Sequence, residues 1–558
     1  MSCDPLAQRR ATDHGRLVEP YSSVLFFRRL GYVRRHREDD AVTTEPSSRA
    51  LTRRNALRLG GLTIGSLGLG ACTAPASDAV TSQLVHGATG GGLKDTLDPH
   101  FPVTWPDIAR VKQLYDPLLR YSPDFEIEPS LAQEVEPNAD ATEWTIRLRE
   151  GVTFHDGRPV RAADVKASIE RIMDPENPAP YASDVAPLAD LGACRVVDPH
   201  TYRLVLKEPY AILDQVLAAY SLGIIPEDFD PAHPVGTGPF KFDLFVPGQR
   251  SRFLRNDDYW DTTASFDELV ILDFADDAAK TNALLAGQVH TIDNLPSYLA
   301  QAIERQGAHT LVSETGGWVP FTMRVDTAPF TDRRVRQAMR FIADRQQMVD
   351  QALNGFGRVA NDLYSPFDPS YIGDQLPQRE QDIDRAASLL KQAGQRDLQV
   401  ELVTSSAVGA GGVESANLFV QHAAKAGVDV RLKKLDGNIF YGEQYLQWVF
   451  AQDFFFTRQY IPQVVGCALE TSPYNETHFG NKRFADLIYA ARAATDPDRR
   501  RMLLQDAQRI EYEDGGYIIW AFKNQVDAYS DFVTGLEPAR EMAVSAFRFN
   551  LVRPAEKL

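Results

Sequence analysis

The sequence predicts an α/β protein with more than one lobe. About 485 of its 558 residues follow Cys72, which exceeds one compact hydrophobic core, so two or three lobes are expected. Helix-like and strand-like patterns alternate in the second half of the chain, as is typical of α/β folds. No internal repeat is evident.

The N-terminal segment has the features of an export signal. Arg53 and Arg54 form a twin-arginine pair, and a weakly apolar, glycine-rich run follows from Leu59 to Gly70. This run is too short and too rich in glycine to span a bilayer. Leu69-Gly70-Ala71-Cys72 resembles a bacterial lipoprotein cleavage box, so the thiol of Cys72 would carry the lipid. The alternative is an uncleaved helix with an incidental cysteine.

Residues 1–50 are rich in arginine and show no clean periodicity. They are interpreted either as an extension removed with the signal or as the product of a start assigned too early. Residues 1–71 are therefore expected to be an N-terminal extension and twin-arginine lipoprotein signal. Residues 72–80 are small and polar, and we expect them to form a tether.

The charge balance argues against nucleic acid as a partner. The chain has 59 basic and 76 acidic residues, and residues 1–71 hold 12 and 7 of these. The mature chain therefore keeps 47 basic and 69 acidic residues, a net charge of −22. Such a surface disfavours phosphate backbones and a basic membrane-binding face, and it is compatible with a soluble body on a tether.

The segment from 143 to 174 has the clearest local pattern. Residues 144–148 alternate between apolar and polar, the period of a half-buried strand. Asp156-Gly157 is a turn signal, because glycine tolerates the positive φ that tight turns often need. Val165, Ile169 and Ile172 then recur at helical spacing. A strand, a turn and a helix are expected in this order.

The second half of the chain alternates between helix and strand patterns. Residues 383–390 are expected to form a helix that is capped by Gly394, and residues 399–404 a strand. Residues 418–426 then read as a helix and 428–432 as a strand.

The phrase LREGVTFHDGRPVRAADV, from Leu148 to Val165, resembles the solute-binding proteins that feed peptide and nickel ABC importers, bacterial extracellular solute-binding protein family 5. Most of the chain after residue 80 shares the resemblance. The further matching segments are 97–100, 115–119, 129–132, 236–240, 255–260 and 330–338.

The resemblance implies a two-lobed periplasmic-binding-protein-like α/β fold with a hinge and an extra α+β subdomain inserted in the first lobe. The implied ranges are 81–110, 216–314 and 518–558 for lobe 1, 111–215 for the inserted subdomain and 316–517 for lobe 2. The chain would return to lobe 1 through one strand at Tyr517–Phe522. Cys194 and Cys467 would lie in different lobes, and we expect them to be free, buried thiols.

The motifs of several other classes are absent from the sequence. The glycine-rich run from Gly87 to Gly92 lacks the Gly-Lys-Ser/Thr ending of a phosphate-binding loop. The sequence has no His-Glu-x-x-His pair and no Gly-x-Ser-x-Gly elbow. We therefore expect no catalytic residues, no cofactor and no structural metal.

The family layout implies which segments line the cleft between the lobes. His100, Phe101 and Trp105 lie in the loop after the first strand, and Tyr115 lies at a domain boundary. At Gly316-Gly317-Trp318 the chain crosses between the lobes, and backbone edges there are expected to pair with an extended ligand.

A fourth segment, Phe450 to Arg458, departs from the family pattern. Peptide-binding members often show an aromatic residue, two further residues and an aspartate that holds the ammonium group of the peptide. Asp453 follows Phe450 at this spacing, but Phe454-Phe455-Phe456 comes next and the first proline is Pro462. Arg458 would pair with Asp453 or bind a carboxylate.

The N-terminal signal and the resemblance together imply a lipid-anchored, monomeric protein on the extracytoplasmic face of the cell membrane, without catalytic activity. It would capture short peptides in the interlobe cleft and deliver them to an ABC permease and ATPase complex. The alternatives are binding of a nickel complex, a sugar or another small solute, or a role as a sensing or envelope lipoprotein outside transport.

Overall fold

The computed structural model describes residues 82–174, 176, 179 and 188–555. The expected signal with Arg53, Arg54 and Cys72, and the tether at 72–80, therefore lie outside the described residues. Within those described ranges, no helix combines the length and the apolar character needed to cross a membrane.

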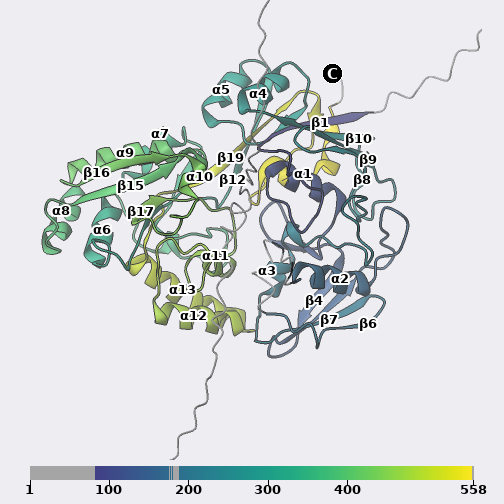
Figure 1. The fold of residues 1–558 in the computed structure, drawn as a ribbon, viewed down its shortest axis with the longest axis horizontal. Coiled ribbons are helices and arrows are strands. Elements are labelled where there is room, and N and C mark those ends of the chain that lie inside the picture. The colour runs from purple at the N-terminus through teal and green to yellow at the C-terminus, as the bar shows by residue number, and fades with distance from the viewer. Residues whose placement is uncertain (1–81, 175, 177–178, 180–187, 556–558) are drawn as a thin grey trace, which may run out of the picture. The chain divides into compact units, whose positions relative to one another are not determined.

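An eight-stranded sheet is built from both ends of the described chain (Figure 1). Its strand order is β12-β19-β11-β1-β10-β9-β8, and β14 pairs with β19 outside this path. The strands are β1 (Gln83–Thr89), β8 (Phe240–Val246), β9 (Arg250–Arg255), β10 (Glu268–Phe274), β11 (Thr291–Ile292), β12 (Ala308–Glu314), β14 (Gly357–Val359) and β19 (Ala521–Ser530). β1 is parallel to β10 and β11, whereas β19 is antiparallel to β11 and β12.

The two faces of this sheet are covered by different helices, because successive strand side chains point to opposite sides. Leu84 and Ala88 of β1 pack in one cluster with α1 (Trp105–Leu114). Val85, between them, packs in another cluster with α4 (Asp277–Leu285) and α5 (Ala300–Glu304). The sheet is therefore buried on both faces.

A second, five-stranded sheet has the order β16-β15-β17-β13-β18. Its strands are β13 (Phe321–Met323), β15 (Gln399–Ser405), β16 (Asp429–Leu435), β17 (Phe450–Gln452) and β18 (Tyr517–Ile518). The helices of this part are α6 (Arg333–Ile342), α7 (Arg345–Ala352), α8 (Ile383–Gln392), α9 (Gly412–Lys425), α10 (Gly437–Phe440), α11 (Tyr460–Cys467), α12 (Lys482–Ala493) and α13 (Pro497–Asp514).

The local predictions for this part are confirmed, with shifted ends. The strand expected at 399–404 is β15, and the helix expected at 383–390 is α8, followed by Gly394 at φ +74°. The helix expected from 418 begins earlier, at Gly412, because Gly411 adopts a left-handed conformation that starts the helix there. The strand expected at 428–432 extends to Leu435 as β16.

A third part holds the four-stranded antiparallel sheet β4-β5-β7-β6 and helix α2 (Figure 1). The elements are β4 (Ala132–Pro137), β5 (Glu143–Leu148), α2 (Ala162–Ile172), β6 (Arg195–Asp198) and β7 (Thr201–Val205). A hairpin of β2 (Leu119–Tyr121) and β3 (Ile127–Pro129) precedes it, and α3 (Leu213–Leu217) follows it. The strand, turn and helix expected at 143–174 are confirmed, with Gly157 at φ +85°.

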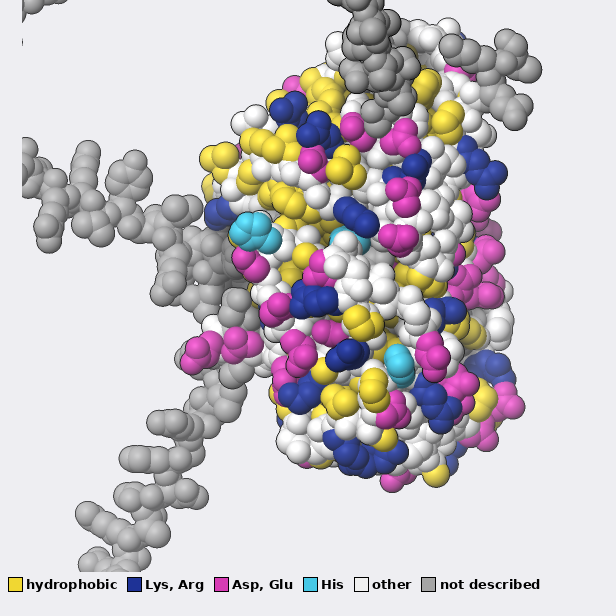
Figure 2. Space-filling model, turned by 90° about the vertical axis from the view of Figure 1, so that its right-hand side faces the viewer, with side chains coloured by type: hydrophobic (Ala, Val, Ile, Leu, Met, Phe, Trp, Pro, Cys, Tyr) yellow, Lys and Arg dark blue, Asp and Glu magenta, His cyan; other side chains and the backbone are white. Residues whose placement is uncertain are grey.

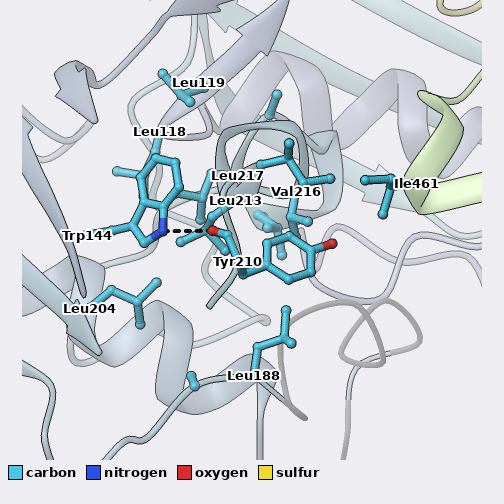
Figure 3. Packing of buried hydrophobic residues seen from close by; sticks show 14 of the residues in the cluster. Leu118, Leu119, Trp144, Leu188, Leu204, Tyr210, Leu213, Val216, Leu217 and Ile461 are labelled. Carbon is cyan, nitrogen blue, oxygen red and sulfur yellow. Dashed lines mark hydrogen bonds between the residues drawn. The ribbon is translucent and has the colours of Figure 1, made fainter. Parts of the chain in front are cut away.

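Trp144 is the centre of packing in this part. Its indole N–H donates to the carbonyl oxygen of Tyr210 at 3.1 Å, and leucines including Leu118, Leu204 and Leu213 surround it (Figure 3). A buried indole needs such a partner, since an unmade hydrogen bond in the core is costly. The segment from 143 to 174, in which Trp144 lies, therefore belongs to the scaffold of this part.

The chain passes between the eight-stranded and five-stranded sheets at 315–320 and again at 519–520, and between these two crossings it returns to the eight-stranded sheet as β14. The single strand expected at Tyr517–Phe522 is wrong. Tyr517 and Ile518 form β18 in one sheet, β19 begins at Ala521 in the other, and Ile519 and Trp520 connect them. Residues 517–522 are all apolar, so the change of sheet left no mark in the pattern. The residue boundaries of the lobes stay a prediction.

The remaining short elements are the strand pair β20 (Val533–Thr534) and β21 (Arg553–Pro554), helix α14 (Ala543–Ala546), and single 3-10 turns. The turns are η3 (Tyr220–Leu222), η4 (Ser297–Leu299), η5 (Gly373–Gln375), η6 (Ser406–Val408) and η7 (Phe549–Leu551).

Cys194 and Cys467 are free and buried, so the expectation for these thiols is confirmed. On the face shown in Figure 2, acidic and basic side chains are interspersed, with apolar ones scattered between them. That face offers no continuous basic surface to a polyanion.

Candidate ligand site

A pocket lies where segments from both sides of the two crossings meet. It encloses about 870 Å³, counting the solvent at its mouth. Its lining comes from α1, the β2–β3 hairpin, α3 with η3, the segment before and at the start of α11, and the residues before α14. The lining residues are Trp105, Ile108, Tyr121, Phe125, Gln215, Val216, Ala219, Tyr220, Ser221, Phe456, Thr457, Arg458, Gln459, Pro462, Glu541 and Met542.

Trp105 and Arg458, two of the residues expected at the cleft, both line this pocket. Trp105 is held at the first position of α1, where the hydroxyl of Thr104 accepts from the backbone N–H of Asp107 in a capping box. Its ring meets Phe456 edge-on at 5.6 Å. The structure therefore brings Trp105, from the part with the eight-stranded sheet, into contact with Phe456, which follows β17 of the five-stranded sheet.

His100 is buried beside the pocket's scaffold and is not among the residues of its lining. Its Nδ1 accepts from Arg171 Nη1 at 2.7 Å, so its Nε2–H donates to the carbonyl oxygen of Gly223 at 2.9 Å. Burial lowers the pKa of His100 to about 4. The ring is therefore neutral and structural near pH 7.

Phe101 and Tyr115 also lie away from the lining residues. The guanidinium of Arg171 lies over the Phe101 ring, 5.5 Å from its centroid. Tyr115 is buried where a Cβ on Gly223 would approach its own Cβ to 2.8 Å, so glycine is needed for this close approach. Phe101 packs against the hydrophobic cluster of the part that holds the four-stranded sheet, and Tyr115 packs in the cluster that contains α1.

Gly317 and Trp318 use their backbone groups within the chain. Trp318 and Phe455 exchange two backbone hydrogen bonds of 3.0 and 2.9 Å, and the Gly317 carbonyl accepts from the Lys523 N–H at 2.8 Å. The Trp318 ring is buried and stacks on Phe455 at 4.4 Å. In this structure the expected ligand-pairing edge is therefore paired with the protein's own strand-like segment.

Phe450 points into the core of the five-stranded sheet, between Phe330 and Phe419. It shares β17 with Ala451 and Gln452, all three buried. The structure does not bring it to the pocket lining.

Asp453 is buried in a cluster of hydroxyl and carboxyl groups. Its carboxylate accepts from the hydroxyls of Tyr441 at 2.9 Å and Tyr445 at 2.8 Å, and from the backbone N–H of Phe454 at 2.8 Å. Glu476 lies on the other side of Tyr445, whose oxygen is 3.1 Å from Glu476 Oε1. Arg458 lines the pocket, and its expected pairing with Asp453 stays a prediction.

This geometry requires a proton on one of the two carboxyls. The Tyr445 hydroxyl has a single proton and lies within hydrogen-bond distance of both, so one carboxyl must itself donate. Burial raises the pKa of Asp453, and burial together with the charge of Asp453 raises the pKa of Glu476 well above its usual range. The two carboxyls therefore hold a shared proton more readily than isolated carboxyls do.

Sequence reasoning missed most of the pocket wall. Tyr121, Phe125, Gln215 and Glu541 come from three segments that meet only in the folded chain. Their local patterns are those of an ordinary hairpin and helix, so no spacing signal singled them out. In the described residues, no group of three or more His, Cys, Asp or Glu side chains is placed to hold a metal.

Two sheets joined by two short crossings, with a pocket lined from both sides, define a two-lobed binding protein. The chain belongs to the bacterial extracellular solute-binding proteins of family 5, because the model of that family's middle region matches residues 126–460. The resemblance predicted from the sequence is confirmed. The family is one of solute-binding proteins and not of enzymes.

The relatives agree over most of the chain. Di/tripeptide-binding protein 2 of Pseudomonas aeruginosa is 28% identical over 488 residues, 80% of this chain and 90% of that protein. Glutathione-binding protein GsiB of Salmonella typhimurium is 25% identical over 505 residues, 85% of this chain and 95% of that protein. The solved structure of the ABC transporter-associated periplasmic binding protein DppA from Helicobacter pylori, in complex with peptide STSA, matches with a TM-score of 0.71 at 22% identity. It covers 85% of this chain and 99% of that chain, and the predicted two-lobed fold is confirmed.

Proposed function

We propose that this protein captures short peptides in the pocket between its lobes and presents them to an ABC permease. The observation that carries the proposal is the wall of the pocket, to which Arg458 and Glu541 bring one charge of each sign among apolar and aromatic side chains. A short peptide has a positive and a negative end and an apolar body, so it matches such a wall. The peptide ligands in the names of the relatives support this choice.

We propose the Asp453–Glu476 pair as the partner of the peptide's ammonium group. Tyrosine hydroxyls surround the pair, at 2.9 and 2.8 Å from the carboxylate of Asp453 and at 2.7 Å from that of Glu476. The ammonium group would take the place of the Tyr441 or Tyr445 hydroxyl at Asp453, so lobe opening must expose it. A buried carboxylate without a cation gains most from such a partner.

The chain's position in the cell follows from its N-terminus. We propose export through the twin-arginine pair Arg53 and Arg54, a lipid on Cys72, and a tether that holds a monomeric binding domain near its permease. The family's extracellular role supports this arrangement.

The experiment that tests the ligand class is native mass spectrometry of the protein purified from its own producer, followed by calorimetric titration with di- and tripeptides. Peptide masses and saturable binding are expected. A co-purified nickel complex or sugar, with no heat from any peptide, would contradict the proposal and favour the alternative small solutes. The absence of neighbouring permease and ATPase genes would favour a sensing role.

A further inference from the structure

The walls of the pocket are dominated by rings that are already in place. Tyr121 stacks on Phe125 with centroids 4.2 Å apart, and both belong to the hairpin of β2 and β3. Trp105 meets Phe456 edge-on at 5.6 Å and so joins the two sides of the pocket. Such rings present a large, rigid apolar surface at a small cost in side-chain entropy. An apolar group of the ligand is the natural occupant of the space between them.

The same pocket contains buried polar atoms that lack partners. Ser221 is 2% exposed and Gln459 is 6% exposed. Neither the Ser221 hydroxyl nor the Oε1 atom of Gln459 has a hydrogen-bond partner in the described chain, and the same holds for Oε1 of Gln215. A buried acceptor without a donor costs about 1–3 kcal/mol. Because these residues line the pocket, a rotation of the side chain would turn these oxygens toward N–H or O–H donors of a ligand.

Two other polar residues of the lining already have partners within the chain. Glu541 lies 3.5 Å from Lys112, which offsets part of its charge. Thr457 is already satisfied, since its hydroxyl donates to the Arg540 carbonyl at 2.7 Å and accepts from the Gly316 N–H at 2.9 Å. The unpartnered oxygens of the lining residues thus favour a ligand that brings N–H or O–H donors beside an apolar group.

We propose that the pocket selects peptides by one large apolar side chain, which enters between Trp105, Tyr121, Phe125 and Phe456, while main-chain N–H groups of the peptide donate to Gln459 and Ser221. This specificity rests on the proposed peptide function. It sets the preferred ligand apart from short peptides whose side chains are charged or strongly polar, because those groups would lose water among the rings without gaining partners.

The test uses two tripeptides that differ only in the central residue, alanyl-leucyl-alanine and alanyl-asparaginyl-alanine, because leucine and asparagine have similar branched shapes. Calorimetry with the full mature protein should show the leucine peptide binding at least about tenfold tighter, since the asparagine amide would lose its hydrogen bonds with water among the rings.

Phe456→Ala should weaken the leucine peptide about tenfold and change the asparagine peptide about twofold or less. Phe456 is 48% exposed, so its truncation leaves the fold intact. Tyr298→Ala is the matched control, because Tyr298 is an aromatic residue 71% exposed in η4, outside the pocket. It should leave both affinities unchanged. Gln459→Met removes the acceptor that both peptides use and should weaken both by a similar factor.

The outcomes separate the two claims. If neither tripeptide nor any other short peptide binds the wild-type protein, the proposed function fails and the specificity fails with it. If both tripeptides bind the wild type equally, or if Phe456→Ala weakens both to the same extent, the specificity is overturned while peptide capture stands.

Discussion

The buried ring of His100 predicts a specific loss of stability in acid. In the folded protein burial lowers the pKa of this histidine from 6.5 to about 4. Between these two values the unfolded chain binds a proton that the folded chain does not, so the free energy of unfolding falls as the pH falls. Each pH unit between the two pKa values is worth about 1.36 kcal/mol, which gives about 3 kcal/mol once the pH is below 4.

The change tested is His100→Asn, and the measurement is urea unfolding at pH 7.5 and pH 5. At pH 5 the linkage relation gives a loss of about 2 kcal/mol from this one ring, and almost none at pH 7.5. The variant loses some stability at both values because the contacts to Arg171 and Gly223 go. Only the difference between its two values matters, and this should be smaller than in the wild type by about 2 kcal/mol.

Between pH 7.5 and pH 9 the ring is neutral in both states, so the two proteins should show equal changes there, which serves as the control. An identical loss from pH 7.5 to pH 5 in wild type and variant would refute the reasoning that burial controls this histidine.

Four further outcomes are expected. Cys72→Ser should move the protein from the membrane to the soluble fraction, and unchanged fractionation would contradict the lipid anchor. Arg53→Lys together with Arg54→Lys should block export, and continued export would indicate another pathway. Asp453→Asn should weaken the binding of a peptide with a free amino group about tenfold or more in calorimetry, since a charge-assisted hydrogen bond is worth about 1.5–3 kcal/mol. The binding of an N-acetylated peptide should hardly change, and equal effects on both peptides would remove Asp453 from the site. Asp362→Ala should lower the free energy of unfolding by about 3–5 kcal/mol, because Arg345 and Arg379 would lose their buried counter-charge. These arginines lie 2.8 and 2.9 Å from the Asp362 carboxylate. A loss below about 1 kcal/mol in urea unfolding would contradict this prediction.

Local periodicity was sufficient for much of the scaffold. The alternation around Trp144 marks the buried face of β5, and the helical spacing of Val165 and Ile169 marks the buried face of α2. Such patterns depend only on neighbours in sequence, so they survive without knowledge of the fold. The change of sheet at Ile519 and Trp520 was not predicted, because the strands on both sides are buried and buried strands of either sheet have the same apolar sequence pattern.

The ligand site was harder, because a buried aromatic residue and a pocket-lining one look the same in sequence. Trp105 and Phe450 were both expected at the cleft, but one lines the pocket and the other packs in the core. Glu541 and Tyr121 are separated by most of the chain and meet only through the return of β19. Distances of this kind are set by the whole topology, which no local pattern contains.

The two crossings at 315–320 and 519–520 also limit how the lobes move. They leave the eight-stranded sheet from β12 and β19, which are antiparallel neighbours with Glu314 opposite Asn524. Two covalent links that start side by side define a line, and bending about that line needs only a few changes of backbone dihedral angle. Twisting one lobe against the other stretches one link while it compresses the other. The pairing of β14 with the first residues of β19 adds a third connection beside these two links, so bending about the same line is the motion that the chain hinders least.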